Sequence, residues 1–129
     1  MQLERTSSAL RALGERLFAL IEDLGGRPPR LLKDGWYSAG SEAGVFLYLY
    51  FVETRSVDRP PLVRLSTRWD DSFADDPRVE QKNNSFGEQA ADTLAHPDHP
   101  GEVAFAEEFV RRALELRRQN ARRKPGRRT

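Results

Sequence analysis

The sequence contains no cysteine, and this absence excludes several kinds of site. Without a thiol the chain cannot form a disulfide, hold a metal through thiolates or use a cysteine nucleophile. It also lacks the Gly-x-Ser-x-Gly motif of serine hydrolases. Gly25 and Gly26 follow a predicted helix rather than a strand, so they do not indicate a phosphate-binding loop. We therefore expect no cofactor and find no catalytic signature.

Long hydrophobic runs are missing as well. The longest, residues 45–52, has eight residues, whereas a membrane-spanning helix needs about 20. The first ten residues are charged and amphipathic, without the continuous apolar stretch of a secretory signal. We expect a cytoplasmic protein that has no membrane partner.

Positive charge is concentrated at the C-terminal end of the chain. Residues 111–129 hold nine basic residues and one acid, a net charge of +8, whereas residues 1–110 hold 12 bases and 19 acids, a net charge of −7. The nine basic residues are Arg111, Arg112, Arg117, Arg118, Arg122, Arg123, Lys124, Arg127 and Arg128. Guanidinium groups bind phosphates in bidentate fashion, and charge neutralisation releases counterions. Our leading hypothesis is a small binding or accessory protein that contacts nucleic acid or another polyanion through this arginine-rich segment.

Two other roles suit the same basic segment. It could serve solely to keep the protein in solution, or it could dock on the acidic remainder of the chain. It could also contact an acidic protein partner. These alternatives stay open at the level of the sequence.

The first part of the chain predicts a helix over residues 3–24. Leucines recur at every seventh position, and Gly25 with Gly26 ends the pattern. The heptad positions are Leu3, Leu10, Leu17 and Leu24. The repeat could form the seam of a homodimer, but Gly14 interrupts it, so we favour a helix that packs on a sheet.

The middle of the chain predicts three strands, over residues 31–39, 45–52 and 62–69. Their short connections favour an antiparallel meander. Residues 70–84 are polar and lack periodicity, which predicts a long loop. Ser85 and Glu88 match a capping box that opens a helix ending near Leu94.

A final helix is predicted to begin near Gly101. The fold class we expect is α+β, in the order α-β-β-β-α-α. It is a three-stranded antiparallel meander with an N-terminal helix and two C-terminal helices. Residues 1–118 would form a single domain, and residues 119–129 a basic tail.

One face of the predicted sheet is a second candidate surface. Tyr48 and Tyr50 share one side of their strand. If Arg64 and Arg68 lie on that side, the face combines aromatic rings with guanidinium groups, which suits single-stranded nucleic acid. Alternatively, the tyrosines are core residues under a helix. The same face, or the leucine-rich helix, could instead bind a protein partner or a second copy of the chain.

The acidic residues after the third predicted strand suggest an enzymatic alternative. Asp70 or Asp71, with Glu80 and Lys82, resembles the residue pattern by which metal-dependent phosphodiesterases hold Mg²⁺ and activate water. A solvated loop explains these residues better, because Glu80 and Lys82 do not lie in an apolar strand.

Two histidines and an aspartate, His96, Asp98 and His99, form a further cluster with metal-binding side chains. A structural metal site normally has four ligands, and Pro97 and Pro100 suit a rigid turn. We therefore predict a turn and no metal at these residues.

Overall fold

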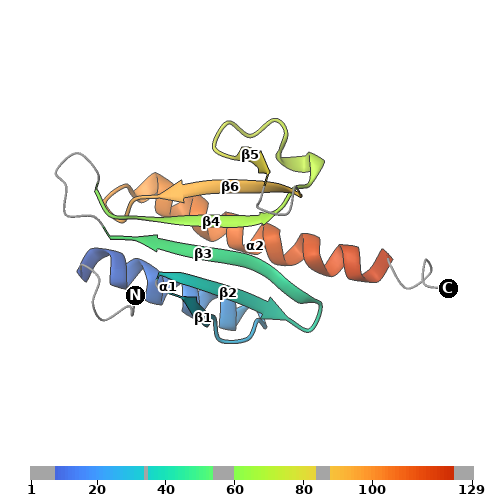
Figure 1. The fold of residues 1–129 in the computed structure, drawn as a ribbon, viewed down its shortest axis with the longest axis horizontal. Helices are drawn as coiled ribbons and strands as arrows, with labels where there is room; N and C mark the ends of the chain where they lie inside the picture. Colours follow the sequence, from blue (N-terminus) through green and yellow to red (C-terminus); the bar gives the residue numbers. More distant parts are fainter. Residues whose placement is uncertain (1–7, 34, 54–59, 84–87, 124–129) are drawn as a thin grey trace.

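A computed structural model of the protein describes residues 8–33, 35–53, 60–83 and 88–123. These residues form one antiparallel sheet of six strands, in the order β1-β2-β3-β4-β6-β5, with two long helices (Figure 1). The strands are β1 (Arg30–Lys33), β2 (Trp36–Ser41), β3 (Gly44–Val52), β4 (Leu62–Arg68), β5 (Glu80–Asn83) and β6 (Gln89–Ala95). The helices are α1 (Ser8–Asp23), the short 3-10 helix η2 (Asp71–Phe73) and α2 (Pro100–Arg123).

The α+β class is confirmed, but the predicted three-stranded meander with two C-terminal helices is wrong. Residues 31–39 do not form one strand. They contribute to two, β1 and β2, which pair as a hairpin. Gly35 permits this reversal because its φ of 80° is readily adopted only by glycine. The polar segment 70–84, predicted to be a loop, contains η2 and the edge strand β5.

The helix predicted to follow the capping box is also wrong. Residues 89–95 form strand β6, which pairs with β4 on one side and with β5 on the other. Ala91, Thr93 and Ala95 alternate toward the core with a period of two. Pairing on both sides outweighs the helix propensity of this short alanine-rich segment. Residues 84–87 of the capping box lie outside the described residues.

Helix α1 follows the leucine pattern that predicted it. Leu10, Leu13, Leu17 and Ile21 are buried on one side of the helix, as expected for a helix that packs on a sheet. At its end the Gly26 N–H donates to the Ile21 carbonyl (2.8 Å), and Gly25 has a φ of 95°. This is a glycine C-cap, as predicted.

Helix α2 begins at Pro100, close to the predicted start, and continues to Arg123. Residues 119–123, expected in a tail, therefore continue the helix. The division into a 1–118 domain and a 119–129 tail stays a prediction. In the described part of the chain no helix is long and apolar enough to cross a membrane.

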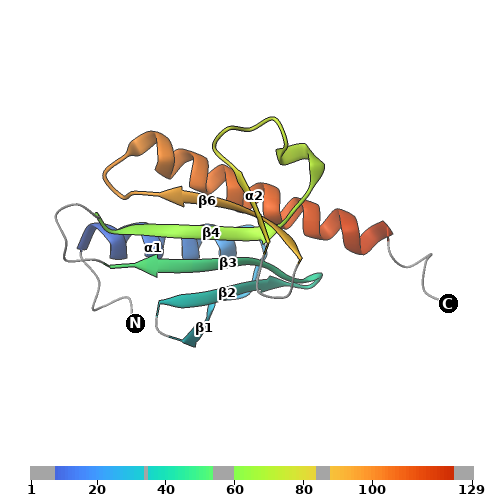
Figure 2. The ribbon, with the colours of Figure 1, turned by 45° about the horizontal axis from the view of Figure 1, so that its top comes forward.

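The hydrophobic core lies between the sheet and the helices. Helix α2 contacts β3, β4 and β6, while α1 contacts β4 and α2. The segment between β4 and β5 closes one end of this core, because Phe73 of η2 is fully buried against Phe109 of α2 (ring centroids 5.6 Å apart). Both helices lie on the same side of the sheet (Figures 1 and 2).

Candidate functional site

The second face of the sheet is not covered by either helix, and we call it the open face (Figure 2). Strand β4 shows the alternation that creates it. Val63, Leu65 and Thr67 are buried toward the helices, while Arg64 and Arg68 point to the opposite face. Alternation along each strand therefore determines which side chains lie on the open face.

Aromatic rings occupy the centre of the open face. Trp36 is the cross-strand partner of Tyr50, and Tyr50 is the partner of Arg64, so the three side chains form a row across β2, β3 and β4. The Trp36 and Tyr50 rings are stacked, with centroids 4.4 Å apart and an interplanar angle of 19°. Tyr48 lies next to this row and is 42% exposed. It is therefore not a core residue under a helix.

The structure thus brings together all four residues of the predicted sheet surface, Tyr48, Tyr50, Arg64 and Arg68. It adds Trp36, which the sequence interpretation missed because residues 31–39 were taken as one irregular strand. The alternation of Trp36 and Ser38 with the apolar Tyr37 and Ala39 was the available signal.

The open face carries more exposed positive than negative charge. Arg30 joins it as the cross-strand partner of Ser38, and Arg68 is exposed. Among its acids, Asp92 is buried and accepts a hydrogen bond from the Ser66 hydroxyl (2.7 Å), whereas Glu80, the cross-strand partner of Asp92, is exposed and pairs with Lys82 (3.4 Å). Arg64 has a buried Nε–H with no hydrogen-bond acceptor among the described residues.

A pocket of about 590 Å³ adjoins this face at the edge of β6. It exists because β5 pairs only with residues 89–92 and leaves the rest of the β6 edge without a neighbouring strand. The pocket reaches from Arg64 and Lys82 on the open face to Glu102 and Phe105 on α2. Its lining is mixed in charge, with Glu80 and Asp92 beside the cations.

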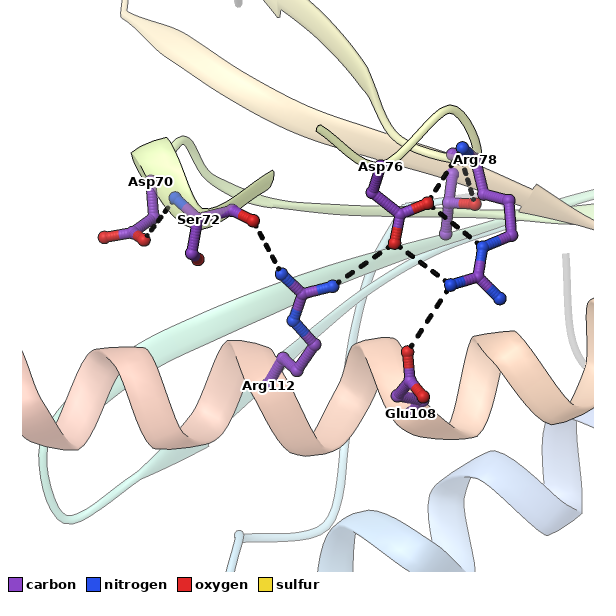
Figure 3. Close-up of polar contacts among 7 residues, drawn as sticks. Asp70, Ser72, Asp76, Arg78, Glu108 and Arg112 are labelled. Carbon is purple, nitrogen blue, oxygen red and sulfur yellow. Dashed lines mark hydrogen bonds and ion pairs between the residues drawn. The ribbon is translucent and has the colours of Figure 1, made fainter. Parts of the chain in front are cut away.

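Three of the C-terminal arginines are used inside the molecule. Arg112 donates to the Ser72 carbonyl (3.2 Å) and to Asp76 (3.5 Å) (Figure 3). Its guanidinium carbon also lies 4.4 Å from the centroid of the Phe73 ring. The pKa of Asp76 is lowered, mainly by its hydrogen bonds from the Arg78 side chain. Through its own contacts with Ser72, Asp76 and Phe73, Arg112 links the segment around η2 to α2.

Arg117 and Arg118 hold the other end of α2. Arg117 Nε donates to the Ala43 carbonyl (2.7 Å). Arg118 forms a bidentate pair with Glu42 (2.9 and 3.2 Å), and its hydrogen bond lowers the pKa of Glu42. Arg117 and Arg118 thus dock on the chain's own surface, which was one of the alternatives for the basic segment.

The remaining predicted arginines divide into two groups. Arg111 and Arg122 are exposed on α2, which lies on the side of the sheet opposite to Arg64 and Arg68. The Arg123 side chain, Lys124, Arg127 and Arg128 lie outside the described residues. The predicted nucleic-acid-binding set is thus split between two faces of the molecule.

The residues of the phosphodiesterase alternative do not converge in the described part of the chain. Asp70 accepts a hydrogen bond from the Ser72 backbone N–H, and Asp71 accepts one from the Trp69 indole. Glu80 pairs with Lys82 (3.4 Å) on β5, which is a strand rather than the predicted loop. Across the described residues, the one group of three or more metal-binding side chains lies elsewhere.

That group consists of His96, His99 and Glu102. Glu102 accepts hydrogen bonds from His96 Nδ1 (2.9 Å), His99 Nδ1 (3.1 Å) and the His96 backbone N–H (2.8 Å). Partial burial raises the pKa of Glu102, but these hydrogen bonds outweigh it and lower the pKa to about 2. Asp98, named with the histidines in the sequence, is not part of the group. Glu102 was missed, although its position three residues after His99 on a helix was a usable signal.

No protein-family model matches the chain, and comparisons with curated proteins and with solved structures find no match. The function must therefore be inferred from the residues themselves. Two surfaces stand out, the aromatic and cationic open face and the histidine–glutamate group at the start of α2.

Proposed function

We propose that the protein binds single-stranded nucleic acid on its open face. The observation that carries this proposal is the row formed by Trp36, Tyr50 and Arg64 across three neighbouring strands. Tyr48 extends the aromatic surface, and Arg68 adds a second guanidinium group. We place this function in the cytoplasm, in agreement with the sequence-based expectation.

Single strands suit this surface better than duplexes. Every base has a π-face that can stack on an aromatic side chain, and such stacking contributes roughly 1–3 kcal/mol per base. In a duplex the bases are already stacked and paired, so the rings of the open face could not reach them. The guanidinium groups beside the rings would neutralise backbone phosphates.

The basic residues from Arg122 to the C-terminus supply a second contribution. Arg122, together with the basic residues that follow it in the sequence, adds long-range attraction for a polyanion without reading its sequence. We assign Arg112, Arg117 and Arg118 a structural role instead, because their donors are occupied within the chain.

A protein partner is the second candidate, supported by a different observation. Leu31 and Leu32 are exposed on β1, which is an edge strand of the sheet. An exposed apolar edge can pair with a strand of another protein or of a second copy. A homodimer through the open face itself is disfavoured, because it would bring two cationic surfaces together.

The test is fluorescence anisotropy with labelled single-stranded RNA, single-stranded DNA and a duplex of the same length. We expect single strands to bind more tightly than the duplex at each salt concentration. Tyr48→Ala should weaken single-strand binding by roughly 5- to 150-fold, the loss of one stacked base. Arg68→Gln should weaken binding to all sequences and reduce the salt slope by about one.

Arg111→Gln is the matched control, since Arg111 is also exposed but lies on α2. It should leave the affinity close to that of the unchanged protein. If Tyr48→Ala binds normally while Arg111→Gln binds weakly, the contact lies on the helix and not on the open face. If no oligonucleotide binds and light scattering gives twice the mass of 14.7 kDa, the edge strand becomes the leading surface.

A further inference from the structure

We propose that His96, His99 and Glu102 form a binding site for a divalent transition-metal ion, for which Zn²⁺ is the natural probe. The ligand atoms of the three side chains all lie within 4.8 Å of one another. This site is separate from the aromatic surface of the open face, and its existence does not depend on nucleic-acid binding.

The spacing of the donor atoms suits a small tetrahedral ion. With metal–ligand bonds of about 2.0–2.1 Å, neighbouring donors in a tetrahedron are about 3.3 Å apart. His96 Nδ1 and His99 Nδ1 lie 2.9 and 3.1 Å from the two carboxylate oxygens of Glu102. These two separations are a few tenths of an ångström shorter than the tetrahedral value, and the third pair of donors lies within 4.8 Å.

The donor chemistry selects the class of ion. Two imidazoles and one carboxylate form a set that binds Zn²⁺ and related ions, whereas Mg²⁺ and Ca²⁺ prefer oxygen ligands alone. Both imidazoles must be neutral and must carry their proton on Nε2 when Nδ1 binds the ion. Three protein ligands leave a position for water, and Glu102 also lines the pocket at the edge of β6.

Rigid backbone holds the three ligands in place. His96 directly follows β6, and Glu102 lies in the first turn of α2. The His99 N–H donates to the His96 carbonyl (3.0 Å), and Pro97 and Pro100 restrict the turn between them. Ordering of the ligands before binding reduces the entropic cost of binding.

The electrostatic field at the start of α2 opposes the binding of a cation. The N-terminus of a helix carries a partial positive charge, which repels a cation. The Glu102 carboxylate offsets this charge. The same hydrogen bonds can also serve only as a cap for the start of α2, and this alternative is an outcome of the experiment.

The experiment is isothermal titration of the full chain with ZnCl₂, after removal of any histidine tag, together with the absorption spectrum of the Co²⁺ form. We expect one ion per chain, a rise in the melting temperature with Zn²⁺, and Co²⁺ bands typical of tetrahedral coordination. His99→Ala should weaken the affinity at least tenfold, since loss of groups that merely support a ligand already costs about 10- to 100-fold.

Asp98→Asn is the matched control, because Asp98 lies in the same turn but outside the group. It should bind Zn²⁺ like the unchanged protein, and Glu102→Gln should bind weakly. Absence of one-to-one binding in the unchanged protein would overturn the proposal and leave a hydrogen-bonded cap only. Binding that survives both His99→Ala and Glu102→Gln would overturn it equally, because the ion would then lie elsewhere.

Discussion

Replacing Phe73 with alanine is expected to lower the free energy of unfolding by about 3–5 kcal/mol, the usual cost of removing a buried phenylalanine. Phe73 is fully buried although it lies in a polar segment. Its ring packs on Phe109 (5.6 Å) and Trp69 (6.0 Å), and the Arg112 guanidinium covers it. Alanine would leave a cavity and remove the surface on which Arg112 rests. Urea denaturation followed by circular dichroism measures the loss.

Ser72→Ala supplies the comparison. Ser72 is exposed, and Arg112 uses its backbone carbonyl rather than its side chain. This variant should change the free energy of unfolding by no more than about 0.5 kcal/mol. Equal effects of the two substitutions would mean that the segment is a solvated loop, as its sequence alone predicts.

Gly35→Ala is expected to destabilise the protein by about 2–4 kcal/mol, through backbone strain and a steric clash. At a φ of 80° an alanine is strained, and its Cβ would lie 2.9 Å from the Phe51 carbonyl oxygen. That oxygen belongs to the backbone of β3 and cannot move aside without disturbing the sheet. The same denaturation experiment measures the effect.

Gly101→Ala is the control for this prediction. A Cβ at Gly101 would meet no atom within 4 Å, and alanine suits a helix better than glycine. We expect this variant to be unchanged or more stable by about 0.4–1 kcal/mol. If Gly35→Ala were equally harmless, the β1–β2 hairpin would not have the described turn.

The parts of the fold that the sequence predicted well are those with strong periodicity. The leucine stripe of α1 and the alternation in β4 each bury one face in the expected way, and the apolar strand β3 lies inside the sheet between β2 and β4. Glycine and proline marked their ends. Where the pattern of a segment agrees with the structure around it, local rules are sufficient.

The parts that failed depend on partners distant in sequence. The capping-box pattern of Ser85 and Glu88 predicts a short helix where β6 lies, and only pairing with β4 and β5 makes this segment a strand. Strand β5 has no apolar residues, since it is an exposed edge strand. No local signal separates such a strand from a polar loop.

The residues of the candidate sites divide in the same way, into those that local patterns placed and those that only the tertiary structure placed. Alternation within strands paired Tyr48 with Tyr50 and Arg64 with Arg68, but only the register between β3 and β4 shows that the two pairs share a face. Trp36 and Glu102 were missed although the sequence carried a signal for each, the alternation around Trp36 and the position of Glu102 three residues after His99. The internal contacts of Arg112, Arg117 and Arg118 also depend on tertiary packing, because their partners lie 36 to 94 residues away in the sequence.

The open face can be tested most directly through the fluorescence of its tryptophan. The chain has two tryptophans. Trp36 stacks on Tyr50 on the open face, and Trp69 lies after β4, packed near Phe73. Each can be observed alone in the variants Trp69→Phe and Trp36→Phe, during titration with single-stranded RNA.

We predict that RNA quenches the emission of Trp36 in the Trp69→Phe variant and leaves Trp69 in the Trp36→Phe variant nearly unchanged, because bases stack on the open face. Quenching of Trp69 alone, or binding detected by anisotropy without any change at Trp36, would contradict a nucleic-acid surface on the open face.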